Sequence, residues 1–89
     1  MKIKQGLILR EIAGEYVVLS VEDSSLNFNR MLVLNESGAE LFRMLQDGAS
    51  PSELVRALLR DYEVGQEQAK NDIRTFLEKL WQSGCMEEA

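Results

Sequence analysis

Residues 34–54, LNESGAELFRMLQDGASPSEL, contain the start and stop of one helix and the start of another. Asn35 is a residue type favoured at a helix N-cap, and Glu36 follows in the first turn, where the helix dipole stabilises a negative charge. Gly48 is placed to end the helix just past its last turn. The apolar positions recur at the helical period: Leu41, Phe42 and Leu45. This stretch therefore predicts a helix between residues 35 and 48.

A second helix is predicted to begin at once. Ser50 and Glu53 have the spacing of a capping box, and Pro51 stands at the first helical position, where its missing N–H costs nothing. We expect this helix to end near Tyr62. Its buried face is predicted to contain Leu54, Leu58 and Leu59, together with Ala57 or Val55.

Two small residues lie one turn before the apolar stripe of the first helix. Gly38 costs about 1 kcal/mol relative to alanine inside a helix. Together with Ala39, it leaves only small side chains on that face of the helix. We therefore expect another backbone to pack closely against Gly38.

A third helix is predicted over residues 66–83. Gly65 is a tolerable N-cap, and Gly84 is placed to end the helix. The apolar positions at helical spacing are Ala69, Ile73, Phe76, Leu77 and Leu80. The remaining tail, CMEEA, is short and acidic, and we expect it to fray.

The first part of the chain has the pattern of strands. Residues 6–12 and 15–21 are apolar runs separated by Ala13-Gly14, which predicts a hairpin with a tight turn. Residues 22–29 are polar and predict a loop, and residues 30–35 are again strand-like. Three antiparallel strands followed by three helices predict one small α+β domain over residues 1–89, with the helices on one face of the sheet. The last two helices would form a winged helix-turn-helix-like unit.

The charge excludes several classes of partner. The formal net charge is −5 and the pI is about 4.7. Binding to nucleic acid or to anionic lipid needs clustered lysine and arginine, and the ten basic residues are scattered. We therefore expect neither nucleic acid nor a membrane as partner. There is no long apolar segment and only one cysteine, Cys85, which favours the reducing cytoplasm.

Catalytic residues are not evident. The sequence has no histidine, so the commonest general base and metal ligand is missing. The glycines are isolated and form no phosphate-binding loop. Cys85 has no histidine partner and is expected to pack passively or to be exposed. We expect no enzyme activity, no metal and no cofactor.

Several segments, in order along the whole chain, resemble the coenzyme PQQ synthesis protein D (PqqD-like) family, the precursor peptide recognition elements of RiPP pathways. LILREIAGEYVVLSV resembles the family's opening hairpin, and LVLNESGAELFRML resembles its most characteristic segment. ASPSELVRALLRDYEV and DIRTFLEKLWQSGCM are similar to its second and third helices. Gly65 departs from the pattern, because the family more often has an acidic helix start there.

The resemblance implies a non-catalytic peptide chaperone. In this family the leader of a ribosomally made precursor peptide adds a strand between the third strand and the third helix. A modifying enzyme, such as a radical SAM protein, is brought to the bound peptide. For this chain it implies a leader-binding site on the third strand and on one border of the third helix. The expected residues are Arg30, Met31, Leu32, Val33, Leu34, Lys70, Arg74, Leu77 and Trp81.

Some alternatives stay open on the sequence alone. The other border of the third helix, with Asp72, Thr75, Lys79 and Ser83, is the second candidate to face the cleft. Lys70 and Arg74 are equally explained by local pairing with Glu67 or Glu78. The competing function is a winged-helix regulatory or protein-interaction domain, with DNA as its less favoured partner. The sequence leaves open whether the pathway is PQQ synthesis or another. It also leaves open whether the chain is a monomer or a weak homodimer.

Overall fold

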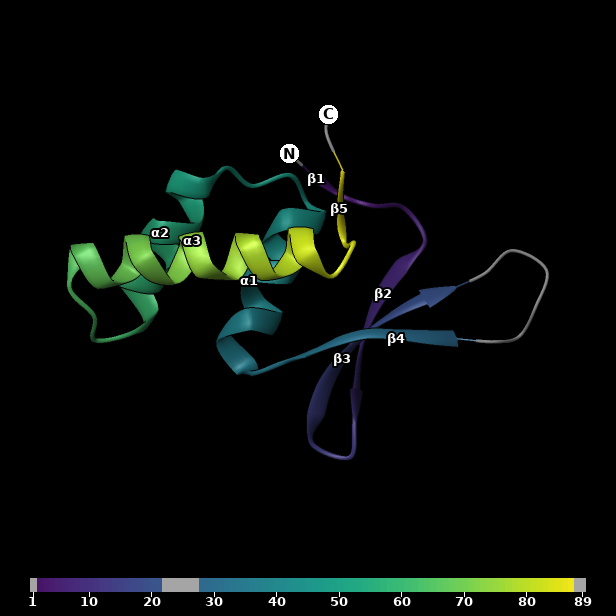
Figure 1. Cartoon of the computed structure of the whole chain (residues 1–89). Coiled ribbons are helices and arrows are strands. Elements are labelled where there is room, and N and C mark those ends of the chain that lie inside the picture. Colours follow the sequence, from purple (N-terminus) through teal and green to yellow (C-terminus); the bar gives the residue numbers. More distant parts are fainter. Residues whose placement is uncertain (1, 22–27, 88–89) are drawn as a thin grey trace.

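The computed structural model describes residues 2–21 and 28–87 (Figure 1). These residues form an antiparallel sheet with strand order β2-β3-β4, a two-stranded sheet of β1 and β5, and three helices. The strands are β1 Lys2–Ile3, β2 Leu7–Ile12, β3 Glu15–Val21, β4 Phe28–Leu34 and β5 Met86–Glu87. The helices are α1 Glu36–Gln46, α2 Pro51–Asp61 and α3 Gln66–Gln82. The predicted α+β class, three antiparallel strands followed by three helices, is confirmed.

The hairpin between β2 and β3 closes as predicted. Ala13 and Gly14 have φ angles of 53° and 84°, the pair of positive values that a two-residue type I′ turn requires. Ile12 and Glu15 are paired on either side of this turn. The register between β2 and β3 continues from that pair without a shift to Leu7 and Ser20.

The third strand begins earlier than predicted. β4 includes residues 28 and 29, which the polar pattern had assigned to a loop, and residues 22–27 of that predicted loop lie outside the described residues. The pairing between β3 and β4 shifts by one between Val18 and Leu19, because Val18 is opposite Leu32 while Leu19 is opposite Arg30. The extra residue, at position 31, makes a bulge in β4.

The helix starts follow the predicted capping. The Asn35 side chain accepts a hydrogen bond from the Gly38 N–H at 2.8 Å. In the capping box of α2, the Glu53 N–H donates to Ser50 Oγ at 3.3 Å and the Ser50 N–H donates to Glu53 Oε1 at 3.1 Å. The Ser50 N–H bond to the carboxylate, helped by the Ser50 side chain, holds the pKa of Glu53 below its ordinary value. Gly65 is the N-cap of α3 without a side-chain hydrogen bond.

Two helices end at glycines. Gly48 and Gly84 have φ angles of 100° and 79°, which only glycine adopts without strain, so the stops of α1 and α3 are as predicted. Tyr62 is the C-cap of α2, as the sequence also predicts.

The expected neighbour of Gly38 is different from the one found. A Cβ atom at this position would lie 3.1 Å from Asn35 Oδ1 and 3.3 Å from Leu34 Cβ. Gly38 therefore makes room for the capping side chain and for the Leu34 side chain at the end of β4, and these side-chain atoms, not backbone atoms, are its nearest neighbours.

The core lies between the helices and the face of the sheet that carries Val18. The largest fully buried side chains are Phe42, Leu45, Leu54, Leu80, Val18 and Cys85. Three residues that the sequence predicts to lie in the core are more exposed than expected. Leu59 is 37% exposed, and Phe76 and Leu77 are only half-buried, since all three border surface grooves.

Residues 85–87 of the C-terminal tail, which the sequence predicts to fray, are paired and packed, and residues 88 and 89 lie outside the described residues. β5 pairs with β1, so the two ends of the described chain lie side by side (Figure 1). The Lys4 N–H donates to the Cys85 carbonyl at 2.9 Å, and Lys2 Nζ lies 3.6 Å from Glu87 Oε1. Cys85 and Met86 are buried against the core. Cys85 packs passively, the first of its two predicted outcomes.

Cys85 is expected to be protected from thiol reagents in the folded protein. Its side chain is fully buried, and burial raises the pKa of the thiol, so less of the reactive thiolate forms. We expect Ellman's reagent to modify native protein at least roughly a hundred-fold more slowly than protein unfolded in guanidinium, because reaction requires local opening. Ser52→Cys, which adds a thiol at an exposed position, serves as the control and should react at once. Equal rates for native and unfolded Cys85 would show that the C-terminal pairing is not stable.

Candidate functional site

A groove opens between the end of β4 and α3. It has a volume of about 400 Å³, and we call it the strand groove. The lining residues are Leu34, Asn35, Ser37, Gly38, Leu41, Leu58, Asp72, Thr75, Phe76 and Lys79. Leu34, Asn35 and Lys79 also border a second hollow of about 690 Å³, which extends the strand groove along β4 and over the β2–β3 turn. Its further lining residues are Glu11, Gly14, Glu15, Tyr16, Val33 and Glu36.

The register determines which backbone groups of β4 face outwards. Pairs in an antiparallel ladder alternate between those that exchange hydrogen bonds and those that do not. Ile12 and Glu15 close a two-residue hairpin, so they are a hydrogen-bonding pair, and Glu15, Val17 and Leu19 use their backbone groups toward β2. Tyr16 and Val18 must then bond to β4.

Val33 is the residue of β4 whose backbone remains free near the strand groove. Leu34 and Leu32 pair with Tyr16 and Val18 and point their N–H and C=O groups toward β3. Val33 lies between them, so its N–H and C=O point to the outer edge. The same alternation turns the Leu7 carbonyl away from β3, and Gln46 Nε2 donates to that carbonyl at 3.4 Å, which agrees with the assignment.

The floor of the strand groove is apolar and its position is fixed. Leu34, Leu41 and Leu58 are buried, and Phe76 is half-buried. Asn35 alone separates β4 from α1, and its cap bond with the Gly38 N–H holds the end of the strand against the start of the helix. The missing side chain at Gly38 keeps this corner open.

The rim of the two hollows is more acidic than basic. Glu11, Glu15, Glu36 and Asp72 line it, and Lys79 is their cationic neighbour among the described lining residues. Asp72 accepts a hydrogen bond from Gln68 Nε2 at 2.8 Å. Tyr16, at the far end, has the Arg43 guanidinium 5.7 Å from its ring centroid.

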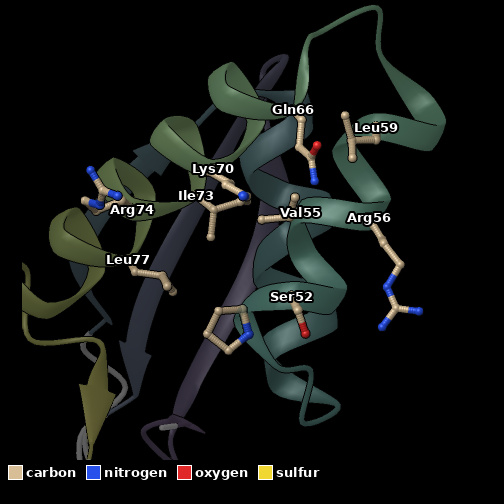
Figure 2. A pocket seen from close by; sticks show the side chains of 10 residues that line it. Ser52, Val55, Arg56, Leu59, Gln66, Lys70, Ile73, Arg74 and Leu77 are labelled. Atoms are coloured by element: carbon tan, nitrogen blue, oxygen red, sulfur yellow. The ribbon is translucent and has the colours of Figure 1, made fainter.

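A second groove lies between α2 and α3 and is called the helix groove (Figure 2). Its volume is about 530 Å³. The lining residues are Pro51, Ser52, Val55, Arg56, Leu59, Gln66, Lys70, Ile73, Arg74 and Leu77.

The predicted site residues fall into two places. Arg30, Met31, Leu32, Val33 and Leu34 all lie in β4 at the edge of the sheet, and Val33 and Leu34 line the hollows beside α3. Lys70, Arg74 and Leu77 instead line the helix groove, and Trp81, 39% exposed, continues their stripe one turn further along α3. The structure places Asp72, Thr75 and Lys79, the second candidate border of α3, beside the end of β4, because α2 packs along the other side of α3.

Comparison with known proteins identifies the family. The family model for coenzyme PQQ synthesis protein D (PqqD) matches residues 15–85. The chain belongs to the PqqD family. No curated protein matches the sequence.

Two solved structures have the same fold as this PqqD-family chain. One is TbiB1 in complex with the TbiA(beta) leader peptide, which is 26% identical, with a TM-score of 0.78 over 100% of this chain and 98% of that one. The other is lasso peptide synthetase B1 complexed with the leader peptide, which is 23% identical, with a TM-score of 0.74 over 98% and 96%. The predicted family resemblance is confirmed. Leader-binding domains of the PqqD type are generally non-catalytic and work with modifying enzymes.

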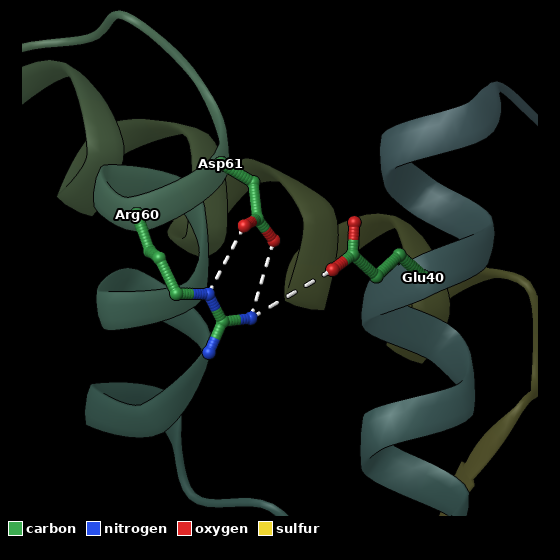
Figure 3. Close-up of polar contacts among 3 residues, drawn as sticks. All are labelled: Glu40, Arg60 and Asp61. Atoms are coloured by element: carbon green, nitrogen blue, oxygen red, sulfur yellow. Dashed lines mark hydrogen bonds and ion pairs between the residues drawn. The ribbon is translucent and has the colours of Figure 1, made fainter.

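A charged cluster joins α1 and α2 outside both grooves (Figure 3). Arg60 Nε donates to Asp61 Oδ1 at 3.0 Å, and Arg60 Nη2 lies 4.0 Å from Glu40 Oε1. Arg60 holds the pKa of Asp61 below its ordinary value, while the neighbouring carboxylate of Asp61 raises the pKa of Glu40. The group is exposed, so it contributes little to stability.

Among the side chains of residues 2–20 and 32–87, no three histidine, cysteine, aspartate or glutamate residues gather as they would around a metal ion. Among the same side chains, every buried polar atom has a hydrogen-bond partner. None of the described helices is long and apolar enough to cross a membrane.

Proposed function

We propose that this PqqD-family chain binds the leader of a ribosomally made precursor peptide as an added strand on the outer edge of β4. It presents that peptide to a maturation enzyme and catalyses no reaction itself. The observation that carries the proposal is the open edge of β4, with the backbone of Val33 facing outwards beside the strand groove. The likeness to TbiB1, which was solved in complex with a leader peptide, supports it.

Strand addition accounts for affinity that does not depend on the peptide's sequence. Unpaired N–H and C=O groups at a sheet edge bond to any extended chain. Side chains of an added strand alternate, so every second one would point at the domain. The apolar floor between Leu34 and Phe76 is the place for one such side chain, and its burial supplies specificity.

The rim charges favour a particular kind of leader. Glu11, Glu15 and Glu36 surround the Val33 end of the hollows, and Lys79 lies between these glutamates and Asp72. A leader with a basic or neutral residue near the β2–β3 turn suits this rim better than an acidic one. The same carboxylates make the strand groove unsuitable for DNA.

The proposed leader site thus keeps Arg30, Met31, Leu32, Val33 and Leu34 from the strand and takes Asp72, Thr75, Phe76 and Lys79 from α3. We also propose one domain over residues 1–89, acting in the cytoplasm, where a free Cys85 is the usual state of a thiol. The open edge can pair with a second copy, so a weak homodimer would compete with the leader.

Thr75→Trp is expected to weaken leader binding roughly ten- to hundred-fold, because the indole fills the place of a buried apolar side chain worth about 1.5–3 kcal/mol. Thr75 is exposed and lines the strand groove, so the fold should tolerate the change. Arg74→Trp is the matched control: the neighbouring residue lines the helix groove, and its variant should bind the leader normally. Fluorescence anisotropy with a labelled leader measures both. A larger loss from Arg74→Trp would place the leader on the other side of α3.

A further inference from the structure

We propose that the helix groove is a docking site for an acidic amphipathic helix of a protein partner. It lies on the opposite side of α3 from the strand groove, and the two grooves share no lining residue. The site can therefore be occupied while β4 is also occupied. The inference does not depend on the proposed leader function.

The charges in the helix groove oppose the charge of the whole chain. The chain has 15 acidic and 10 basic residues, yet the described residues that line the helix groove include Arg56, Lys70 and Arg74 and no carboxylate. Figure 2 shows Arg56 extending from α2 on one side and Arg74 from α3 on the other. A ligand in the groove therefore meets positive charge on both flanks.

These cations are not neutralised within the described part of the chain. Arg56, Lys70 and Arg74 form no ion pair there, whereas Lys2 and Arg60 do. Local pairing with Glu67 or Glu78, which the sequence left open for Lys70 and Arg74, is not formed. The nearest side-chain partner of Arg74 is Asn71 Oδ1 at 3.5 Å. Lys70 and Arg74 are one helical turn apart, so their repulsion would be relieved by carboxylates of a partner.

The floor between the cations is apolar. Val55 and Leu59 come from α2, and Ile73 and Leu77 come from α3, on the two sides of the groove (Figure 2). Leu59 is 37% exposed, and Trp81, 39% exposed, extends the apolar surface beyond Leu77. A groove between two helices with such a floor is suited to a third helix that inserts apolar residues spaced three and four apart.

The cations on the flanks and the apolar floor of the helix groove together favour one class of occupant. Nucleic acid would bind the cations but would gain nothing from the apolar floor, and the net charge of −5 would repel it. A basic helix would fit the floor but would meet three cations. An amphipathic helix with glutamate or aspartate beside its apolar face satisfies both features, and charge complementarity would also speed its association.

The test uses a synthetic amphipathic helix of about 18 residues, with leucine on one face and glutamate on its flanks, and a lysine-flanked version of the same peptide. Each is added to the isotope-labelled full chain while amide shifts are recorded. We expect the glutamate peptide to shift residues 51–59 and 66–77 and to leave residues 32–35 unmoved. Arg74→Glu should weaken this binding roughly ten-fold and should improve binding of the lysine peptide. Arg10→Glu makes the same charge change on β2 and should have no effect.

Three results would overturn the proposal. The first is the absence of shifts in the helix groove at millimolar peptide, and the second is equal binding of the two peptides. The third is the same set of shifts when the protein alone is concentrated, which would make a second copy the occupant. Leader binding at β4 is measured on other residues, so failure of either proposal is seen separately.

Discussion

Val33→Pro is expected to remove most leader binding while the protein stays folded. The Val33 N–H faces the outer edge of β4, so its loss takes nothing from the pairing with β3. An added strand loses one hydrogen bond and leaves a buried acceptor unpaired, which costs about 1–3 kcal/mol, or roughly ten- to hundred-fold in affinity. The proline ring also blocks close approach. Leader affinity is measured by isothermal titration, and folding by urea unfolding.

Two further variants separate the backbone from the side chain and from the fold. Val33→Thr keeps the N–H and the branched shape, so its affinity should change little. Leu32→Pro removes an N–H that bonds to Val18 of β3, and it should destabilise the protein by about 3 kcal/mol. If Val33→Pro unfolded the protein as strongly as Leu32→Pro, the assignment of the outer edge would be wrong. If folded Val33→Pro bound the leader with unchanged affinity, this would contradict the addition of a strand at this residue.

Phe42→Ala is expected to destabilise the protein more than any of the groove or strand-edge variants. Phe42 is fully buried on α1, in the core between the sheet and the other helices. Truncating a buried phenylalanine costs about 3–5 kcal/mol. Since a domain of this size has a total stability of about 5–10 kcal/mol, the midpoint of thermal unfolding should fall by roughly 15–30 °C.

Phe42→Leu is the matched control, because it keeps most of the volume and should cost only about 1 kcal/mol. Both variants are compared with the wild type by urea unfolding followed by circular dichroism. A loss below about 1 kcal/mol in Phe42→Ala would mean that α1 does not pack against the core through this side chain. Because Phe42 lines neither groove, the folded fraction of Phe42→Leu should bind the leader normally.

Features determined by neighbouring residues could be predicted from the sequence. The cap at Asn35, the capping box of Ser50 and Glu53 and the stop at Gly84 each depend on a few adjacent positions, and all three are present. The turn at Ala13-Gly14 is of the same kind. The pairing of β1 with β5 could not be predicted. Each strand has two residues, which is too short to show the alternation of apolar and polar positions, and the two strands meet only when the ends of the chain come together.

The border of α3 that lies beside β4 could not be predicted for a related reason. Helical spacing shows that Arg74 and Thr75 point about 100° apart, but not which of them faces the sheet. That choice depends on α2, which packs along the Lys70 side of α3 and leaves the Thr75 side to β4. The exposed Leu59 was a possible signal, since it makes the apolar face of α2 wider than the core requires.

The most direct test of strand addition is hydrogen exchange at the Val33 amide, followed by NMR with and without a synthetic leader peptide that binds the chain. Alone, the Val33 N–H faces the open edge and should exchange quickly, while those of Leu32 and Leu34 are protected by β3. We predict that the leader slows exchange at Val33 and shifts residues 72–79. Continued fast exchange at Val33 in a saturated complex would contradict binding of the leader at the edge of β4.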